Sequence, residues 1–277
     1  MKRTFIAVLM LSLALFLTGC NKRNNNGVTT EGVLVVGMEC DYQPFNWTET
    51  EKSDSNVEIS NIKGAYANGY DVMIAKRIAE ALNLELQIKA LSWEGLIPAL
   101  NAGEIDLIIA GMSPTEERKQ TIAFSSSYYT STHVLLMRND SNYRNATTLS
   151  GFSGARVIGQ SGTIYADLVP QVVEKGGIAG TNLDTVPQIV NAILRGTVDI
   201  TILEEPVAIG IVSNYPELTY VTPTDGFNVS EEDVVVSIGV RQNFGLLNDI
   251  NNALNNISAQ TRKELMLRAI EIAPSGE

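Results

Sequence analysis

Continuous apolar runs alternate along this chain with stretches in which apolar residues recur every three or four positions. The runs predict buried strands, and the recurrence predicts helices with one buried face. In the first half these elements follow one another as strand, helix, strand, helix and strand, over residues 33–37, 70–82, 84–88, 93–101 and 106–110. That order is typical of βαβ units, which build a parallel sheet.

The alternation begins again in the second half, where elements are predicted over 156–159, 165–174, 186–194, 199–203 and from 206 onward. Two apolar, β-rich segments, 132–137 and 234–240, are predicted to cross between the halves, and helices at 246–257 and 262–272 follow. The sequence therefore predicts an α/β fold of two lobes with two hinge crossings and an interlobe cleft. The first lobe is expected to comprise 33–134 and 237–277, and the second 138–233.

The first 32 residues have a different pattern. A short basic start is followed by an almost wholly apolar stretch at 5–17 and then by Leu17-Thr18-Gly19-Cys20. The apolar stretch is short for a membrane span, so 1–19 is predicted to be a signal peptide. The end of this segment resembles a bacterial lipobox, which implies cleavage before Cys20 and lipidation of its sulfur. A plain secretory signal is the alternative.

The polar, asparagine-rich segment that follows predicts a flexible tether over 20–32. Two acyl chains on Cys20 would hold the protein on a bilayer, where one chain binds only marginally. We therefore expect a lipid-anchored protein on the extracytoplasmic face of the cell membrane.

Composition excludes several classes of function. The 277 residues carry a net charge of −11, which disfavours nucleic acid as a partner because phosphates require a basic face. The only cysteines are Cys20 and Cys40 and the only histidine is His133, so neither a Cys/His zinc site nor two-histidine catalysis is available. Cys40 is expected to be a small buried residue rather than a reactive thiol. His133 is expected to be structural rather than a pH switch.

Polar and aromatic residues follow four of the five predicted strands, at the strand ends where ligands bind in open α/β sheets. They are Glu39, Tyr42, Gly111, Ser113, Arg118, Gln160, Thr163 and Glu204. An arginine fork and helix-opening N–H groups suit a carboxylate, and an acid suits an ammonium group. Each residue alone has an ordinary core or surface explanation. Their joint placement predicts a site for a zwitterion.

The chain resembles the polar amino-acid-binding proteins of ABC importers, the family-3 solute-binding proteins with a type II periplasmic binding fold. The resemblance covers nearly all of 33–272. It depends on Tyr42-x-Pro44-Phe45, Gly69-Tyr70-Asp71-Val72, Trp93-Glu94-Gly95-Leu96-Ile97-Pro98-Ala99-Leu100, Gly103-Glu104-Ile105-Asp106, Ala110-Gly111-Met112-Ser113-x-Thr115-x-x-Arg118, Ile122-Ala123-Phe124-Ser125, Gln160-Ser161-Gly162-Thr163 and Glu204-Glu205-Pro206.

This resemblance implies roles at the two ends of an amino acid. Arg118 matches the residue that clamps the α-carboxylate, helped by Ser113 and by the Thr163 N–H group. Glu204 matches the acid that pairs with the α-ammonium group, together with the Ala110 carbonyl. Glu204 is one methylene longer than the aspartate usual at that position, which leaves the geometry around the amine open.

The resemblance also implies how the ligand side chain is held. Tyr42 and Tyr70 match an aromatic pair that sandwiches the side chain, Gly111 allows close backbone approach, and Glu39 matches an acid deeper in the pocket. Gln160 lies where relatives vary with their ligand. Relatives often carry an acid where Met73 stands, and the polar segment 48–68 is longer than usual and is left unassigned.

Charge narrows the predicted ligand. Arg118 and Glu204 balance the two ends of a zwitterion, so Glu39 is an additional charge that requires a cation or an amide donor. Aromatic faces favour a flat or cationic group between them. We therefore predict a cationic amino acid, arginine before lysine or histidine, with glutamine as the main alternative. A second possibility is that Glu39 bonds only within its own lobe.

The expected mechanism is hinge closure of the two lobes on the ligand. The closed protein would then dock on a membrane permease that is driven by a separate ATPase chain, since no Gly-x-x-x-x-Gly-Lys phosphate loop occurs here. We expect a monomer without metal or cofactor. Rival interpretations are a dehydratase-type enzyme on the same fold, which Glu39 or Glu204 would serve as acid or base, and a sensor or adhesin.

Overall fold

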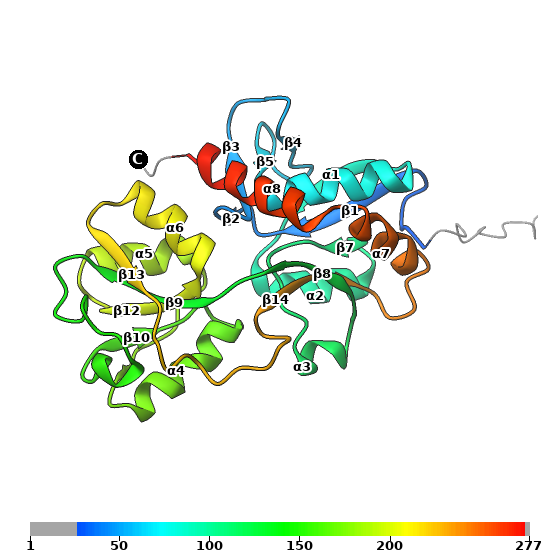
Figure 1. Ribbon diagram of the computed structural model, residues 1–277. Coiled ribbons are helices and arrows are strands. Elements are labelled where there is room, and N and C mark those ends of the chain that lie inside the picture. The colour runs from blue at the N-terminus through cyan, green and yellow to red at the C-terminus, as the bar shows by residue number, and fades with distance from the viewer. Residues whose placement is uncertain (1–26, 275–277) are drawn as a thin grey trace, which may run out of the picture.

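The computed structural model describes residues 27–274 and has a five-stranded sheet in each of two lobes (Figure 1). The sheet of lobe one has the order β6-β1-β7-β14-β8, with strands Glu85–Ala90, Val33–Met38, Leu107–Ile108, Val235–Val240 and Ala123–Thr130. Strand β1 pairs in parallel with β6, where Val33 lies opposite Glu85, and with β7. Strand β14 is antiparallel to both of its neighbours.

The sheet of lobe two repeats this plan. Its order is β11-β10-β12-β9-β13, with strands Ile178–Ala179, Arg156–Ile158, Ile200–Glu204, His133–Arg138 and Leu218–Val221. Strand β10 is parallel to both β11 and β12, and β9 is antiparallel to β12 and β13. The prediction of two α/β lobes is confirmed.

Helices cover both sheets, and all but the short α3 and η1 overlap the segments where the apolar period predicted a helix. In lobe one they are α1 (Tyr70–Leu82), α2 (Trp93–Ala102), α3 (Glu116–Lys119), α7 (Leu247–Asn255) and α8 (Ala259–Ile272). In lobe two they are η1 (Leu149–Phe152), α4 (Ile164–Glu174), α5 (Val186–Leu194) and α6 (Glu205–Asn214). Helix α2 begins after Ser92 and ends at Gly103, whose φ of 75° is a left-handed conformation that glycine adopts without strain.

One of the two crossings between the lobes, the one that joins β8 to β9, is shorter than predicted. Strand β9 joins β8 through only residues 131–132, whereas residues 222–234 connect β13 to β14 (Figure 1). The segments predicted as crossings therefore lie mostly inside the two sheets, as β9 and β14. The prediction did not identify β8, because its many serine and tyrosine residues give no continuous apolar run.

The unassigned segment 48–68 extends lobe one by a small sheet. Its order is β2-β3-β5-β4, with strands Asp41–Tyr42, Asn46–Glu49, Tyr66–Asn68 and Val57–Glu58. The Glu49 carboxylate accepts hydrogen bonds from Trp47 Nε1, Asn56 Nδ2 and Asn68 Nδ2 at 3.1, 2.7 and 2.9 Å. These side-chain hydrogen bonds join the strands of the segment. Its buried apolar residues, Ile59, Ala65 and Ala67, are few and irregularly spaced, so its sequence shows no period.

The signal peptide 1–19, the lipidation of Cys20 and the start of the tether lie outside the described residues and stay predictions. Among the helices that the structure does describe, none is long and apolar enough to cross a membrane.

Candidate ligand-binding site

A small cavity of about 10 Å³ lies between the lobes where the strand ends of lobe one face the start of α4. It is lined by Glu39, Tyr42, Trp93, Gly111, Ser113, Arg118, Gln160, Thr163, Ile164 and Tyr165. The first six of these residues belong to lobe one and the last four to lobe two. The structure thus brings together seven of the ten residues that the sequence nominated for ligand binding.

Two of the other three nominated residues adjoin this cavity. Ala110 is buried directly before Gly111. Glu204 ends β12 and is the N-cap residue of α6, and its buried carboxylate accepts a hydrogen bond from the Tyr42 hydroxyl across the interlobe boundary. Burial raises the pKa of Glu204, and hydrogen bonds from the Tyr165 and Tyr42 hydroxyls partly oppose this rise.

Tyr70 does not line the cavity. Its side chain is fully buried in lobe one, its ring packs on Phe45 and Tyr129 at centroid distances of 6.0 and 5.4 Å, and its hydroxyl donates to the Tyr128 carbonyl at 2.8 Å. As the first residue of α1, it turns towards the core because the helix packs on the sheet of lobe one. Tyr70 is therefore a core residue here. Of the aromatic pair expected to hold the ligand side chain, only Tyr42 lines the cavity.

Trp93 is one of two aromatic residues at the cavity that the sequence interpretation missed. It is the first residue of α2, and its Nε1 donates to the Gly162 carbonyl of lobe two at 2.8 Å. The signal was available, because Trp93 follows a predicted strand and the predicted N-cap Ser92, but it was used only to place the helix. Tyr165, in the first turn of α4, was missed in the same way.

The Arg118 guanidinium lies at the cavity, where it is held by carbonyl groups of both lobes. Its Nη1 donates to the Ser113 carbonyl at 2.8 Å, and its Nη2 donates to the Gly162 carbonyl at 3.3 Å. The guanidinium carbon lies 5.0 Å from the centroid of the Trp93 ring, a cation–π distance. Although burial lowers the pKa of Arg118, an arginine keeps its charge in proteins. The group is placed to receive a carboxylate.

Glu39 meets lobe two directly. Its Oε1 accepts a hydrogen bond of 2.9 Å from Gln160 Nε2, which also donates to the Asp184 carbonyl at 3.0 Å. This interlobe bond contradicts the alternative that Glu39 bonds only within its own lobe. Burial, with a smaller contribution from nearby Asp41, raises the pKa of Glu39 to about 8. A cation beside Glu39 would therefore stabilise its ionised form.

An acidic vestibule of about 510 Å³ adjoins the cavity and shares Glu39 and Trp93 with it. Four carboxyl groups line the vestibule, and its lining contains no lysine or arginine; the carboxyl groups belong to Glu39, Asp41, Glu94 and Asp184. Such a one-signed entrance raises the local concentration of cations.

Cys40 and His133 are both buried, as expected for structural residues. Burial raises the pKa of the Cys40 thiol to about 12, so the reactive thiolate is strongly disfavoured. The His133 ring lies edge-on to Tyr165 and Phe227 at centroid distances of 5.7 and 6.2 Å. Within residues 27–274, no group of three or more His, Cys, Asp and Glu side chains is placed to hold a metal ion.

Comparison with known proteins gives a consistent result. Residues 34–269 match the bacterial extracellular solute-binding proteins, family 3. The arginine-binding extracellular protein ArtP of Bacillus subtilis is 26% identical over 259 residues, which span 93% of each chain. Two similar solved structures are an ancestral arginine-binding protein bound to arginine (28% identity, TM-score 0.69, 86% of this chain and 97% of that one) and an ancestral arginine-binding protein bound to glutamine (26%, 0.70, 86% and 98%).

Proposed function

The chain belongs to the bacterial extracellular solute-binding proteins of family 3, and we propose that it captures a cationic amino acid for an ABC importer, arginine before lysine or histidine. The observation that carries this preference is Glu39, whose carboxyl group lies at the interlobe boundary beside an acidic vestibule. A cation there would satisfy a charge that burial otherwise disfavours.

The two ends of the amino acid are assigned to charged groups from opposite lobes. Arg118 of lobe one receives the α-carboxylate, together with the N–H groups at the start of α4, where Thr163 is the N-cap. Glu204 of lobe two accepts from the α-ammonium group and exchanges part of its bonding with Tyr42 for the ligand. A ligand that contacts both lobes favours the closed form, because the open form offers only some of these contacts.

The ligand side chain is assigned to the space between Tyr42 and Trp93, with its end at Glu39. Tyr42 stacks on Phe45 at 5.6 Å and is buried, so its ring is a fixed wall. Trp93 replaces Tyr70 as the second wall. Since a cavity of about 10 Å³ holds no more than a water molecule, the lobes must separate to admit an amino acid.

Glutamine is the second candidate, and one observation favours it. With a pKa of about 8, Glu39 is largely protonated at neutral pH in the absence of a cation. A neutral carboxyl group beside the Gln160 amide suits a ligand amide, which can both donate and accept hydrogen bonds. That ancestral arginine-binding proteins were solved with arginine and with glutamine is consistent with either candidate.

In this proposal the protein works as a monomer, held at the membrane by a lipid on Cys20, and delivers its ligand to a permease powered by a separate ATPase. We propose binding rather than catalysis, because each carboxyl group at the cavity is assigned to a charge or an amide of the ligand. The boundaries of the lobes, 33–134 with 237–277 and 138–233, are part of the same proposal.

Glu39→Gln tests the assignment. The variant should bind arginine about 10 to 100-fold more weakly in calorimetric titration, because the ligand cation loses its counter-charge, while glutamine binding should change little. Glu58→Gln, which alters an exposed acid on β4, is the matched control. Unchanged arginine binding in Glu39→Gln would remove the basis for a cationic ligand and leave glutamine as the better candidate.

A further inference from the structure

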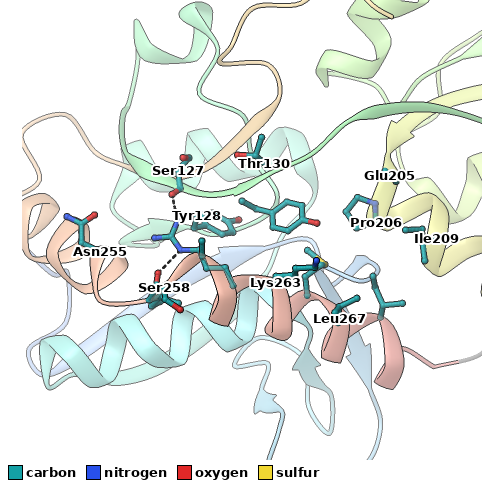
Figure 2. A pocket seen from close by; sticks show the side chains of 16 residues that line it. Ser127, Tyr128, Thr130, Glu205, Pro206, Ile209, Asn255, Ser258, Lys263 and Leu267 are labelled. Atoms are coloured by element: carbon teal, nitrogen blue, oxygen red, sulfur yellow. Dashed lines mark hydrogen bonds between the residues drawn. The ribbon is translucent and has the colours of Figure 1, made fainter. Parts of the chain in front are cut away.

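A second and much larger space lies behind the hinge. Figure 2 shows this groove of about 690 Å³ between α8 of lobe one and α6 of lobe two, with β8 as its floor. Apolar side chains dominate its two walls: Met266, Leu267 and Ile270 on α8, and Pro206 and Ile209 on α6. We call it the rear groove.

The rear groove lies on the side of the crossing strands opposite the ligand cavity. Figure 1 shows α6 and α8 on one side of β8 and β14, and α3 and α4 on the other. No residue lines both spaces. Consecutive residues mark the divide, since Glu204 bonds to Tyr42 at the cavity whereas Glu205 lines the rear groove. A rotation about the crossings that separates the lobes at the cavity therefore brings the walls of the rear groove together.

The walls of the rear groove are not filled in the closed protein. Leu267 is 56% exposed, the most among the large apolar side chains that stand out at the described surface. Glu205 and Lys263 carry opposite charges on opposite walls, and neither takes part in an ion pair within residues 27–274. The walls already meet at one end, where Asn214 Nδ2 donates to the Pro274 carbonyl at 3.0 Å.

Arg262 does not fill this space, because its guanidinium is used elsewhere. It donates to the carbonyls of Ser127, Leu254 and Ile257 at 2.8, 2.6 and 3.1 Å and so ties α8 to β8 and to the end of α7. The wall formed by α8 is therefore fixed on lobe one and moves with it as a unit.

We propose that the rear groove sets ligand affinity from outside the binding site. Opening of the lobes narrows it, buries Leu267 and Ile209 against each other's wall and brings Glu205 towards Lys263, all of which stabilise the open form. Apparent affinity falls in proportion to the fraction of free protein that is closed, so whatever stabilises the open form weakens ligand binding. The proposal rests on the hinge closure described above but not on which amino acid is bound.

Leu267→Trp tests this role, because a larger side chain prevents the walls from meeting and so disfavours the open form. Small-angle X-ray scattering should show that the ligand-free variant is more compact than the parent protein. Its dissociation constant for arginine should fall about 3 to 10-fold. Leu267→Ser, which removes apolar area without adding bulk, should change both quantities in the same direction by a smaller amount.

Ile178→Trp is the matched control, since Ile178 is a similarly exposed side chain on the edge strand β11 of lobe two and does not line the rear groove. It should leave compactness and affinity unchanged. An unchanged or more open ligand-free state in both Leu267 variants, with thermal unfolding confirming that they are folded, overturns the proposal. If arginine fails to bind, the proposed ligand is wrong, and the ligand-free scattering still decides the role of the rear groove.

Discussion

The front and the rear of the hinge differ in how their walls meet. At the front, side chains from both lobes enclose about 10 Å³ and bond to one another, as Glu39 does with Gln160. At the rear, about 690 Å³ stays open between walls that touch at one end. By volume alone, the rear groove would be chosen as the ligand site. The charged groups that complement an amino acid are at the front, which shows that the chemistry of the lining identifies this site better than its size.

The difference follows from what each surface must do. Buried charges at the front are costly unless they are paired, so with no ligand they pair across the lobes with protein groups. The walls at the rear are mostly apolar, and the hydrogen bond from Asn214 to Pro274 joins them at one end, so they can part at little cost in polar contacts. The front is therefore suited to exchange protein partners for ligand, and the rear is suited to movement.

Removal of the carboxylate clamp should give the largest effect. Arg118→Met is expected to weaken binding of any amino acid by about 3–5 kcal/mol, roughly 150-fold or more, because the ligand carboxylate is left buried and unpaired. Titration calorimetry measures this loss. The control is Arg138→Met, at a partly exposed arginine that pairs with Asp140 in lobe two, away from the cavity. If the Arg118 variant bound like the parent protein, the front cavity would not be the site.

The next largest effect is a pH dependence of arginine affinity that arises from the ionisation of Glu39. Its pKa of about 8 in the free protein should fall when a cation binds beside it, so binding releases a proton. Arginine affinity should therefore rise by up to about tenfold per pH unit between pH 6 and 8 and level off above that. Calorimetry across this range checks the slope. The slope should vanish in Glu39→Gln, and a slope that persists there would belong to another group.

The smallest of these effects distinguishes the cavity aromatic from the core aromatic. Trp93→Leu should weaken arginine binding by about 1–2 kcal/mol, because a cation–π face is lost. Tyr70→Phe should leave affinity unchanged and lower the free energy of unfolding by about 1 kcal/mol, since only a buried hydrogen bond is removed. Binding and denaturant titrations of both variants test the pair. If Tyr70→Phe weakened arginine binding and Trp93→Leu did not, Tyr70 rather than Trp93 would contact the ligand side chain.

Elements with a strong period could be predicted from the sequence. Helix α1 begins and ends at the predicted residues, because its apolar face repeats without interruption from Tyr70 to Leu82. The strand-end rule also located most of the cavity, since it requires only the order of elements and the polar residues that follow them.

The other features of the fold and the site could not be predicted from the sequence, because they depend on tertiary contacts. The direction of the Tyr70 ring depends on Phe45 and Tyr129, which are distant in sequence and show no periodic relation to it. The strands within 48–68 are joined by hydrogen bonds from side-chain amides to the Glu49 carboxylate, and only a few irregularly spaced apolar residues of this segment are buried. The rear groove depends on how α6 and α8 approach each other across two lobes, which no local pattern encodes.

The most direct test is calorimetric titration of residues 28–277 with each of the twenty amino acids, after unfolding and refolding to remove bound ligand. We predict tight binding of arginine, weaker binding of lysine and histidine, and the weakest binding of aspartate and glutamate, whose side-chain charge Glu39 cannot balance. Tight binding of glutamine or another neutral amino acid, with none of the cationic ones, would contradict the role given to Glu39.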